Sequence, residues 1–212
     1  MEFFYPPGGE PDSIIVVDSF VYTQDPCGHT SSFGPELSQR LALCGFRTLV
    51  VACSGARVMA YDYHLVFDHL LLLRRRYRFL LLVSMGNDIS FGYFRHRPDC
   101  GIELASRLGG LAVRASASAD FVGVIFGGSS EVWGYDPDAW SRLFDSRVHQ
   151  CLSALRVCFP DLYCDDGTLH LRGCSLADSV GHLSTDSREF GIRSLLAAVW
   201  SMHLTGRVRS RL

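Results

Sequence analysis

The sequence contains no lysine, so that all 20 of its basic residues are arginine. This absence excludes mechanisms that need a lysine amine, such as Schiff-base chemistry or phosphate binding by a P-loop lysine. The formal net charge of −2 at pH 7 provides no general attraction to nucleic acid or to an anionic membrane. Nucleic acid is therefore not the expected partner, although the arginine-rich segment 204–212 leaves contact with phosphates open as an alternative.

The sequence also lacks an apolar run that is long enough to cross a membrane. Its most apolar region, Leu65 to Met85, is interrupted by a cluster of arginines between residues 74 and 78, whereas a membrane-spanning helix needs about 20 consecutive apolar residues. The first residues have neither a basic start nor a sustained apolar stretch, so they do not have the pattern of a secretory signal. The cysteines form no C-x-x-C pair, and we expect reduced thiols and a cytoplasmic or other intracellular location.

Short apolar runs alternate with segments of helical pattern along the chain. Apolar runs of this kind are typical of strands buried on both faces of a parallel sheet, and the intervening helices would cover those faces. We therefore predict a single α/β domain over residues 1–212, with 1–12 as an N-terminal extension and 204–212 as a basic tail. The predicted strands are 14–17, 48–52, 79–83 and 121–126, and the predicted helices are 35–44, 61–75, 100–108, 137–157 and 188–202.

Candidate functional groups follow the first three of these strands. Ser19 follows the first strand, Gly55 follows the second, and Asn87, the only asparagine in the chain, follows the third. Parallel strands end at one edge of their sheet, and open α/β sheets bind ligands there. A serine hydroxyl at this edge can act as a nucleophile, while a glycine N–H and an asparagine amide can donate to an oxyanion. Taken singly, each has a simpler interpretation: a turn hydrogen bond for Ser19, a tight turn for Gly55 and a loop cap for Asn87.

A serine nucleophile needs a base, and two segments have the pattern Asp-x-x-x-His. In one of them, Asp178 and His182 precede residues 184–187, which supply helix-capping side chains ahead of an apolar helix. In the other, Asp166 and His170 lie in an alternating polar and apolar pattern that is typical of a hairpin strand. We favour His182 as the base with Asp178 as the acid that orients it, and we keep His170 with Asp166 as the alternative pair.

Together these segments resemble the four sequence blocks of the SGNH hydrolases, also called GDSL-type esterases and lipases. In the family's order, the blocks are Val17-Asp18-Ser19, Ser54-Gly55-Ala56, Met85-Gly86-Asn87-Asp88 and the segment from Asp178 to His182. They span most of the chain. The resemblance implies a flavodoxin-like, three-layer α/β/α sandwich with a mostly parallel sheet of about five strands.

The resemblance also implies an activity, the hydrolysis of acyl (carboxylic) esters. Ser19 would attack the acyl carbonyl, His182 would accept its proton, and Asp178 would orient His182. The N–H groups of Ser19 and Gly55 and the amide of Asn87 would form the oxyanion hole. This mechanism uses no metal ion and no cofactor, and its substrate would be a small-molecule, carbohydrate or lipid ester.

The chain departs from the family pattern in each of three blocks. Val17 and Met85 replace glycines that are usual in the first and third blocks, and we expect their side chains to reshape the mouth of the pocket. The spacing between Asp178 and His182 is one residue longer than usual, which leaves a histidine–serine dyad open. Two rival interpretations follow: an SGNH-like domain that binds a ligand or protein without turnover, and an esterase-like module of a nucleic-acid-associated polyprotein.

Overall fold

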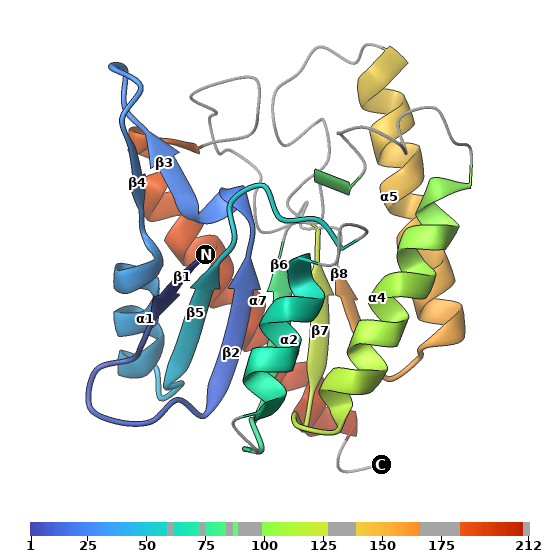
Figure 1. Cartoon of the computed structure of the whole chain (residues 1–212), viewed down its shortest axis with the longest axis horizontal. Coiled ribbons are helices and arrows are strands. Elements are labelled where there is room, and N and C mark those ends of the chain that lie inside the picture. Colours follow the sequence, from blue (N-terminus) through green and yellow to red (C-terminus); the bar gives the residue numbers. More distant parts are fainter. Residues whose placement is uncertain are drawn as a thin grey trace.

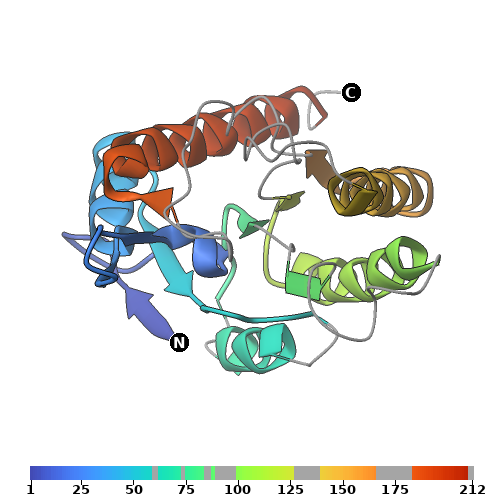
Figure 2. The same cartoon turned by 90° about the horizontal axis from the view of Figure 1, so that it is seen from above.

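The fold is a sheet covered by helices on both faces, seen in a computed structural model (Figure 1). Viewed from above, one layer contains α1 (Gly34–Leu43) and α7 (Arg188–Arg209), and the other contains α2 (Asp62–Leu72), α4 (Cys100–Ser116) and α5 (Ala139–Cys158) (Figure 2). This arrangement confirms the predicted three-layer α/β/α sandwich. The structure describes residues 1–58, 62–72, 75–83, 87–88, 99–126, 139–165 and 183–209.

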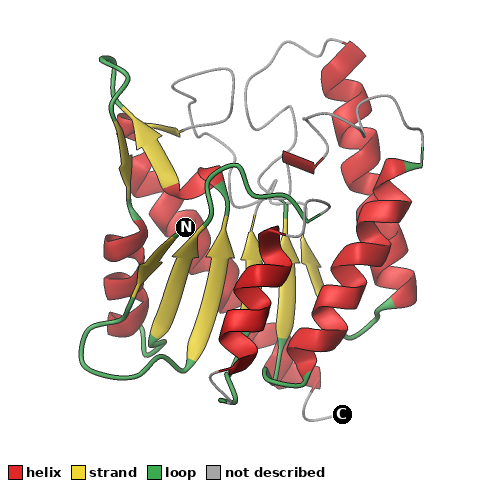
Figure 3. Ribbon diagram, viewed as in Figure 1, coloured by secondary structure: helices red, strands yellow, loops and turns green. Residues whose placement is uncertain are grey.

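The main sheet has six strands in the order β1-β5-β2-β6-β7-β8. The pairs from β5 to β8 are parallel, whereas β1 runs antiparallel to β5 at the edge. Because the other strands share one direction, their carboxyl ends meet at one edge of the sheet (Figure 3). The strands are β1 (Glu2–Phe4), β2 (Ser13–Val17), β5 (Thr48–Ala52), β6 (Leu80–Val83), β7 (Val122–Ile125) and β8 (Tyr163–Asp165).

Strand β2 lies inside the sheet, and its successive side chains point into opposite cores. Ile14 and Val16 belong to the core beneath α2, α4 and α5, while Ile15 and Val17 belong to the core beneath α1 and α7. All four side chains are fully buried. A strand that is buried on both faces has no polar alternation, which explains why this segment is apolar at each position.

The sheet has six strands, whereas about five were predicted. The prediction was too low because two short strands at the edges have no clear sequence pattern. Strand β1 comes from residues 1–12, which were expected to form an extension, and it pairs with β5. Strand β8 follows α5 and pairs with β7. Each is three residues long and only partly buried, so neither contains the continuous apolar run that identifies the central strands.

Two helices extend beyond their predicted ends. Helix α4 continues to Ser116, although the sequence pattern predicted an end at residue 108, just before Gly109 and Gly110. At Gly109 the glycine allows close packing, since a Cβ there would lie 2.0 Å from Cε2 of Phe159. Helix α7 likewise continues to Arg209, within the segment expected to be a tail. Of the helices described, none is both long enough and apolar enough for a membrane crossing.

A second, small sheet lies beyond the carboxyl ends of β2 and β5 (Figure 1). It consists of β3 (Tyr22–Gln24), β4 (Thr30–Ser32) and β9 (Leu183–Ser184), in the order β4-β3-β9. Strands β3 and β9 are parallel, with Thr23 opposite Leu183. This pairing joins a strand close to the first predicted block with the residue that directly follows the last one.

Candidate active site

Ser19 lies immediately beyond the carboxyl end of β2, where the chain leaves the sheet. It is the first residue of a short 3₁₀ helix, Ser19–Val21, which is capped by Asp18. The carboxylate Oδ1 of Asp18 accepts a hydrogen bond of 3.0 Å from the N–H of Phe20. Asp18 is buried and Ser19 is half-buried. The cap therefore holds the serine hydroxyl at the sheet edge with access to solvent.

Gly55 brings the loop after β5 against this serine. Its backbone N–H donates a hydrogen bond of 3.1 Å to Oγ of Ser19. The loop is anchored by the N–H of Cys53, which donates to the carbonyl of Val17 at 2.7 Å. Gly55 has a φ of +69°, in the left-handed region that favours glycine. The position thus needs a glycine for its backbone conformation, and that conformation aims an N–H at the serine.

Asn87 is buried, with 8% of its surface exposed, and it connects the loops after β2 and β5. Its Nδ2 donates to the carbonyl of Ala56 at 3.3 Å and to Oδ2 of Asp18 at 3.4 Å. Both bonds are long for N–H···O hydrogen bonds, which are usually near 2.9 Å. The next residue, Asp88, accepts the N–H of Val58 at 2.9 Å. Asn87 is therefore bonded to the residue before Ser19 and to the residue after Gly55, at the edge where Gly55 bonds to Ser19.

The predicted base and acid lie outside the described residues. This is true of His182 and Asp178, and it is equally true of the alternative pair, His170 and Asp166. The structure describes the chain again from Leu183, which is fully buried. Leu183 lies opposite Thr23, and the hydroxyl of Thr185 donates to the carbonyl of Gln24 at 3.3 Å. The residue after His182 is therefore tied to the strand that follows Ser19.

The structure shows partners of the site that the sequence pattern did not single out. Asp18 and Asp88 were seen only as members of their blocks, yet each carboxylate is buried and accepts a backbone N–H. Tyr22 begins β3, and burial, followed by the nearby Glu2 carboxylate, raises its pKa to about 12. Its hydroxyl therefore stays protonated at neutral pH. An aspartate that closely follows an apolar strand is the sequence signal that could have marked both residues.

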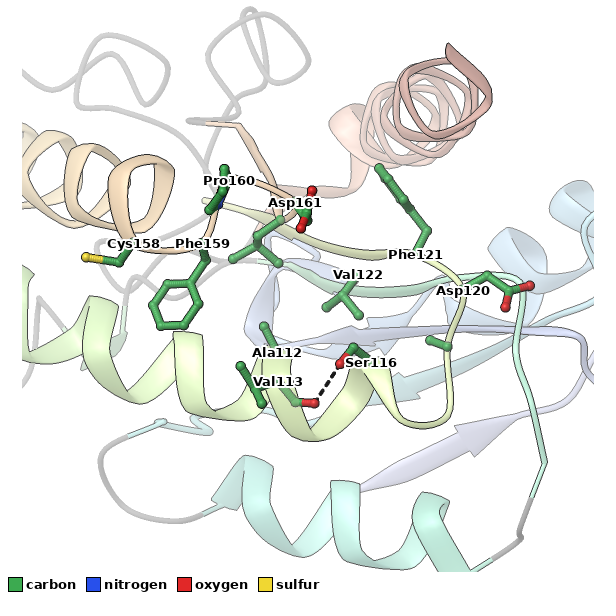
Figure 4. Close-up of a pocket in the computed structure, with 12 residues that line it drawn as sticks. Ala112, Val113, Ser116, Asp120, Phe121, Val122, Cys158, Phe159, Pro160 and Asp161 are labelled. Atoms are coloured by element: carbon green, nitrogen blue, oxygen red, sulfur yellow. Dashed lines mark hydrogen bonds between the residues drawn. The ribbon is translucent and has the colours of Figure 1, made fainter. Parts of the chain in front are cut away.

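A separate pocket of about 520 Å³ lies at the opposite edge of the main sheet (Figure 4). It is bordered by the last turns of α4 and α5 and by the amino end of β7, and its lining includes Ser116, Asp120, Phe121 and Phe159. None of the residues gathered around Ser19 lines it. We assign the candidate active site to the carboxyl edge, because the polar groups converge there.

In the part of the chain that the structure describes, no group of three or more His, Cys, Asp or Glu side chains could hold a metal ion. His64 and Asp68 lie four residues apart on α2, a spacing at which two side chains of one helix could share a metal. The guanidinium of Arg114 contacts both, with Nη1 3.1 Å from Nδ1 of His64 and Nη2 on the carboxylate of Asp68. The two side chains therefore share a protein partner, the guanidinium of Arg114.

No match to the chain was found among models of protein families or among curated proteins. Among solved structures it is similar to an acetylxylan esterase from Geobacillus stearothermophilus, with a TM-score of 0.61 and 14% identity over 90% of this chain and 94% of that one. It is also similar to an α/β hydrolase enzyme from the metagenome of Lake Arreo, Spain, with a TM-score of 0.63 and 14% identity over 90% and 95%. A third similar structure is a carbohydrate esterase family 2 enzyme with a carbohydrate-binding domain from Corynascus thermopiles (Myceliophthora fergusii), with a TM-score of 0.59 and 14% identity over 92% and 67%.

Further solved structures of the Geobacillus esterase are catalytic mutants in which a serine, an aspartate or a histidine is replaced by alanine. The TM-scores show a common fold, and at identities of 13% to 16% the similarity concerns the fold alone. The chain has the fold of these esterases, which is the fold that its resemblance to the SGNH hydrolases implies.

Proposed function

We propose that this protein is a serine hydrolase that cleaves acyl esters through an acyl-serine intermediate, with Ser19 as the nucleophile. The observation that supports this most directly is the hydrogen bond of 3.1 Å from the N–H of Gly55 to Oγ of Ser19. It joins two neighbouring strand ends at the edge where this fold class binds ligands. A hydroxyl already beside a preorganised donor is well placed for acyl transfer.

The oxyanion hole would use the donors already near the hydroxyl. When Oγ of Ser19 bonds to the acyl carbon, negative charge develops on the former carbonyl oxygen. The N–H of Gly55 can then donate to that oxygen, together with the N–H of Ser19 itself. The amide of Asn87 can redirect one hydrogen from its long contacts of 3.3 and 3.4 Å at little cost. Such donors act most strongly in the transition state, where the charge is largest.

His182 is the better candidate for the base, because its chain neighbour is anchored near the nucleophile. Consecutive Cα atoms are about 3.8 Å apart, and Leu183 lies opposite Thr23 in the small sheet. Asp166 instead directly follows β8, which is separated from β2 by β6 and β7. Strands are spaced by about 4.8 Å, so that β8 lies roughly 14 Å from β2. This difference favours His182 over His170.

The proposed reaction has two steps. His182 takes the proton of Ser19 while Oγ attacks the acyl carbon, and it then gives that proton to the departing alcohol. A water molecule, deprotonated by His182, next attacks the acyl carbon; the bond to Oγ of Ser19 breaks, His182 returns the proton to Oγ, and the carboxylic acid is released. Asp178 would hold the histidine ring in the required orientation. The acetylxylan esterases of the same fold suggest that short acyl esters of carbohydrates be tested first.

A fluorophosphonate probe, followed by a panel of p-nitrophenyl esters from acetate to palmitate, would test the proposal. The wild-type protein should be labelled and should hydrolyse at least one ester, and Ser19→Ala should lose both properties while keeping its fold. Ser116→Ala is the matched control, because Ser116 is an exposed serine that lines the pocket at the opposite edge. Labelling that survives in Ser19→Ala would overturn the assignment. Wild-type protein without labelling would support a binding domain that lacks turnover.

A further inference from the structure

The first turn of α7 is fixed to α1 by a cluster of charged side chains, which we call the α1–α7 clamp: Glu36, Arg40, Arg188 and Glu189. The guanidinium of Arg40 binds both carboxylate oxygens of Glu189, with Nη1 to Oε1 at 2.8 Å and Nη2 to Oε2 at 2.7 Å. The same Nη2 donates to Glu36 at 2.6 Å. Nε of Arg188 donates to the second oxygen of Glu36 at 3.2 Å. These bonds join residues far apart in the sequence across the helix interface.

The clamp differs from an ordinary surface ion pair in its geometry and in its exposure. Its side chains are 32% to 44% exposed, whereas Arg193, which also contacts Glu189, is 74% exposed. Two-point binding of a carboxylate by an arginine fixes orientation as well as distance. The hydrogen bonds from Arg40, and then those from Arg193, lower the pKa of Glu189 to about 2, so that this carboxylate is ionised at neutral pH.

A second restraint lies two residues further along α7, at Gly191. A Cβ at this position would lie 2.8 Å from Cδ1 of Leu183 and 3.3 Å from Cζ of Phe33. Phe33 is itself bound to the 3₁₀ helix that begins with Ser19, because its N–H donates to the carbonyl of Val21 at 3.0 Å. Because α7 approaches closely at Gly191, it packs against both Leu183 and Phe33, which is bonded to the segment that carries Ser19.

Both restraints act on the segment that directly follows the proposed base. Leu183 is paired with Thr23, and Thr185 is hydrogen-bonded to the carbonyl of Gln24. The clamp then holds the helix that begins at Arg188. A displacement of α7 along α1 would carry β9 with it, since only the 3₁₀ helix Thr185–Ser187 lies between them. Displacements of about 1 Å at a catalytic group can reduce a rate by ~10²-fold.

We propose that the bidentate Arg40–Glu189 pair and the close contact at Gly191 are positioning elements, which hold β9, the strand that directly follows the proposed base, in register with β3, the strand that follows the Ser19 helix. This inference rests on the proposed function. It assigns to Arg40, Glu189 and Gly191 an effect on turnover although none of them belongs to the residues gathered around Ser19. A purely structural role would instead change stability alone.

Kinetics of Glu189→Gln provide the first arm of the test. This variant keeps the shape of the side chain and removes the negative charge of the carboxylate that Arg40 binds. We expect kcat for an active p-nitrophenyl ester to fall about tenfold or more, in line with the sensitivity of rates to position, with KM nearly unchanged. The rate of fluorophosphonate labelling should fall in parallel.

The control for this arm is Asp120→Asn, which breaks the ion pair of Asp120 with Arg76 at the opposite edge of the sheet. It should change Tm little and leave kcat within about twofold, as expected of an exposed pair. Equal kcat values in Glu189→Gln and the wild type would overturn the positioning role. A loss of kcat in Asp120→Asn as large as that in Glu189→Gln would also overturn it.

The contact at Gly191 provides a second arm with a rescue. Gly191→Ala should lower kcat, because its new methyl group collides with Leu183. Leu183→Val removes the colliding Cδ1 atom, so that the double variant Gly191→Ala/Leu183→Val should be faster than Gly191→Ala alone. A double variant that is slower than both single variants would contradict transmission through this contact.

Hydrogen exchange separates the failure of this inference from the failure of the proposed function. Amides of residues 183–187 should exchange faster in Glu189→Gln and Gly191→Ala than in the wild type, whether or not the protein turns over an ester. Unchanged exchange would overturn the restraint itself. Faster exchange with a wild-type protein that neither hydrolyses nor reacts with the probe would overturn the proposed function and, with it, the catalytic half of this inference.

Discussion

The amide of Asn87 lies between two oxygen acceptors, with Nδ2 at 3.4 Å from Oδ2 of Asp18 and at 3.3 Å from the carbonyl of Ala56. These acceptors determine which way the amide faces, since the reversed orientation would place Oδ1 against two oxygens. Asp18 also caps the helix that carries Ser19. One buried carboxylate thus orients both the proposed nucleophile and a proposed oxyanion donor.

Asn87→Ala should lower kcat by ~10²–10³, or roughly 3–4 kcal/mol of transition-state stabilisation, with a smaller change in KM. The donor contributes most when charge has developed on the substrate oxygen. Steady-state kinetics on the best ester of the p-nitrophenyl panel would measure this split. A change confined to KM would show that Asn87 contacts the ground state or serves only to connect the loops.

The two candidate bases should differ in their pH profiles. A base must be unprotonated to accept the serine proton, so kcat/KM should fall below the pKa of an ordinary histidine, ~6.5. His182→Ala should remove this acidic limb along with most of the activity, whereas His170→Ala should keep both. The opposite pattern would move the base to His170 and the acid to Asp166. If neither variant loses the limb, both candidate bases are excluded, and the interpretation as a domain without turnover is favoured.

Glu189 should contribute to the loss of stability in acid. Its pKa is lowered from 4.5 to about 2 in the folded protein. A carboxylate with a lowered pKa stabilises the fold above its unfolded pKa, and this contribution disappears as the pH falls through the folded value. Glu189→Gln should therefore lose less stability than the wild type between pH values of about 5 and about 2, measured by urea unfolding.

Arg40→Gln should reduce the acid sensitivity in the same way, because the hydrogen bonds from Arg40 are the largest cause of the shift. In this variant Glu189 is unchanged and keeps only its contact with Arg193. Identical acid sensitivity in all three proteins would show that the ion cluster does not contribute to stability in this range.

Gly109 and Gly110 form a matched pair on α4 for testing core packing. A Cβ on Gly109 would lie 2.0 Å from the ring of Phe159, while a Cβ on Gly110 would meet no atom within 4 Å. Gly109→Ala should destabilise the protein by about 1–3 kcal/mol through overpacking. Gly110→Ala should stabilise it by about 0.5–1 kcal/mol, since alanine favours a helix over glycine. Urea unfolding of the two variants measures both effects, and equal signs would contradict the packing account.

The sequence predicted the central part of the fold and the group around Ser19 for a common physical reason. Strands buried on both faces, such as β2 and β5, are apolar after their first residue, and polar residues that follow them lie at the sheet edge. Ser19, Gly55 and Asn87 were therefore identifiable from their positions alone. Hydrogen bonds join Gly55 to Ser19, and they join Asn87 to the chain neighbours Asp18 and Ala56.

Other features depend on contacts that no local pattern records. Strands β1, β8 and β9 have two or three residues each and are only partly buried, so they form because a neighbouring strand is available. The length of α4 was underestimated because glycine usually weakens a helix, whereas Gly109 makes room for a distant phenylalanine ring. The α1–α7 clamp was not predicted either, since its partners lie far apart in the chain.

The pairing of β3 with β9 has a consequence for the order of events during synthesis. Ser19 is synthesised 164 residues before Leu183, and the helix that supports Leu183 is synthesised later still. Strand β3 therefore cannot pair with β9 until synthesis has passed Ser184. Under the proposed mechanism, a nascent or prematurely ended chain carries an ordinary serine hydroxyl, and ester cleavage begins only when the two distant parts of the chain have paired.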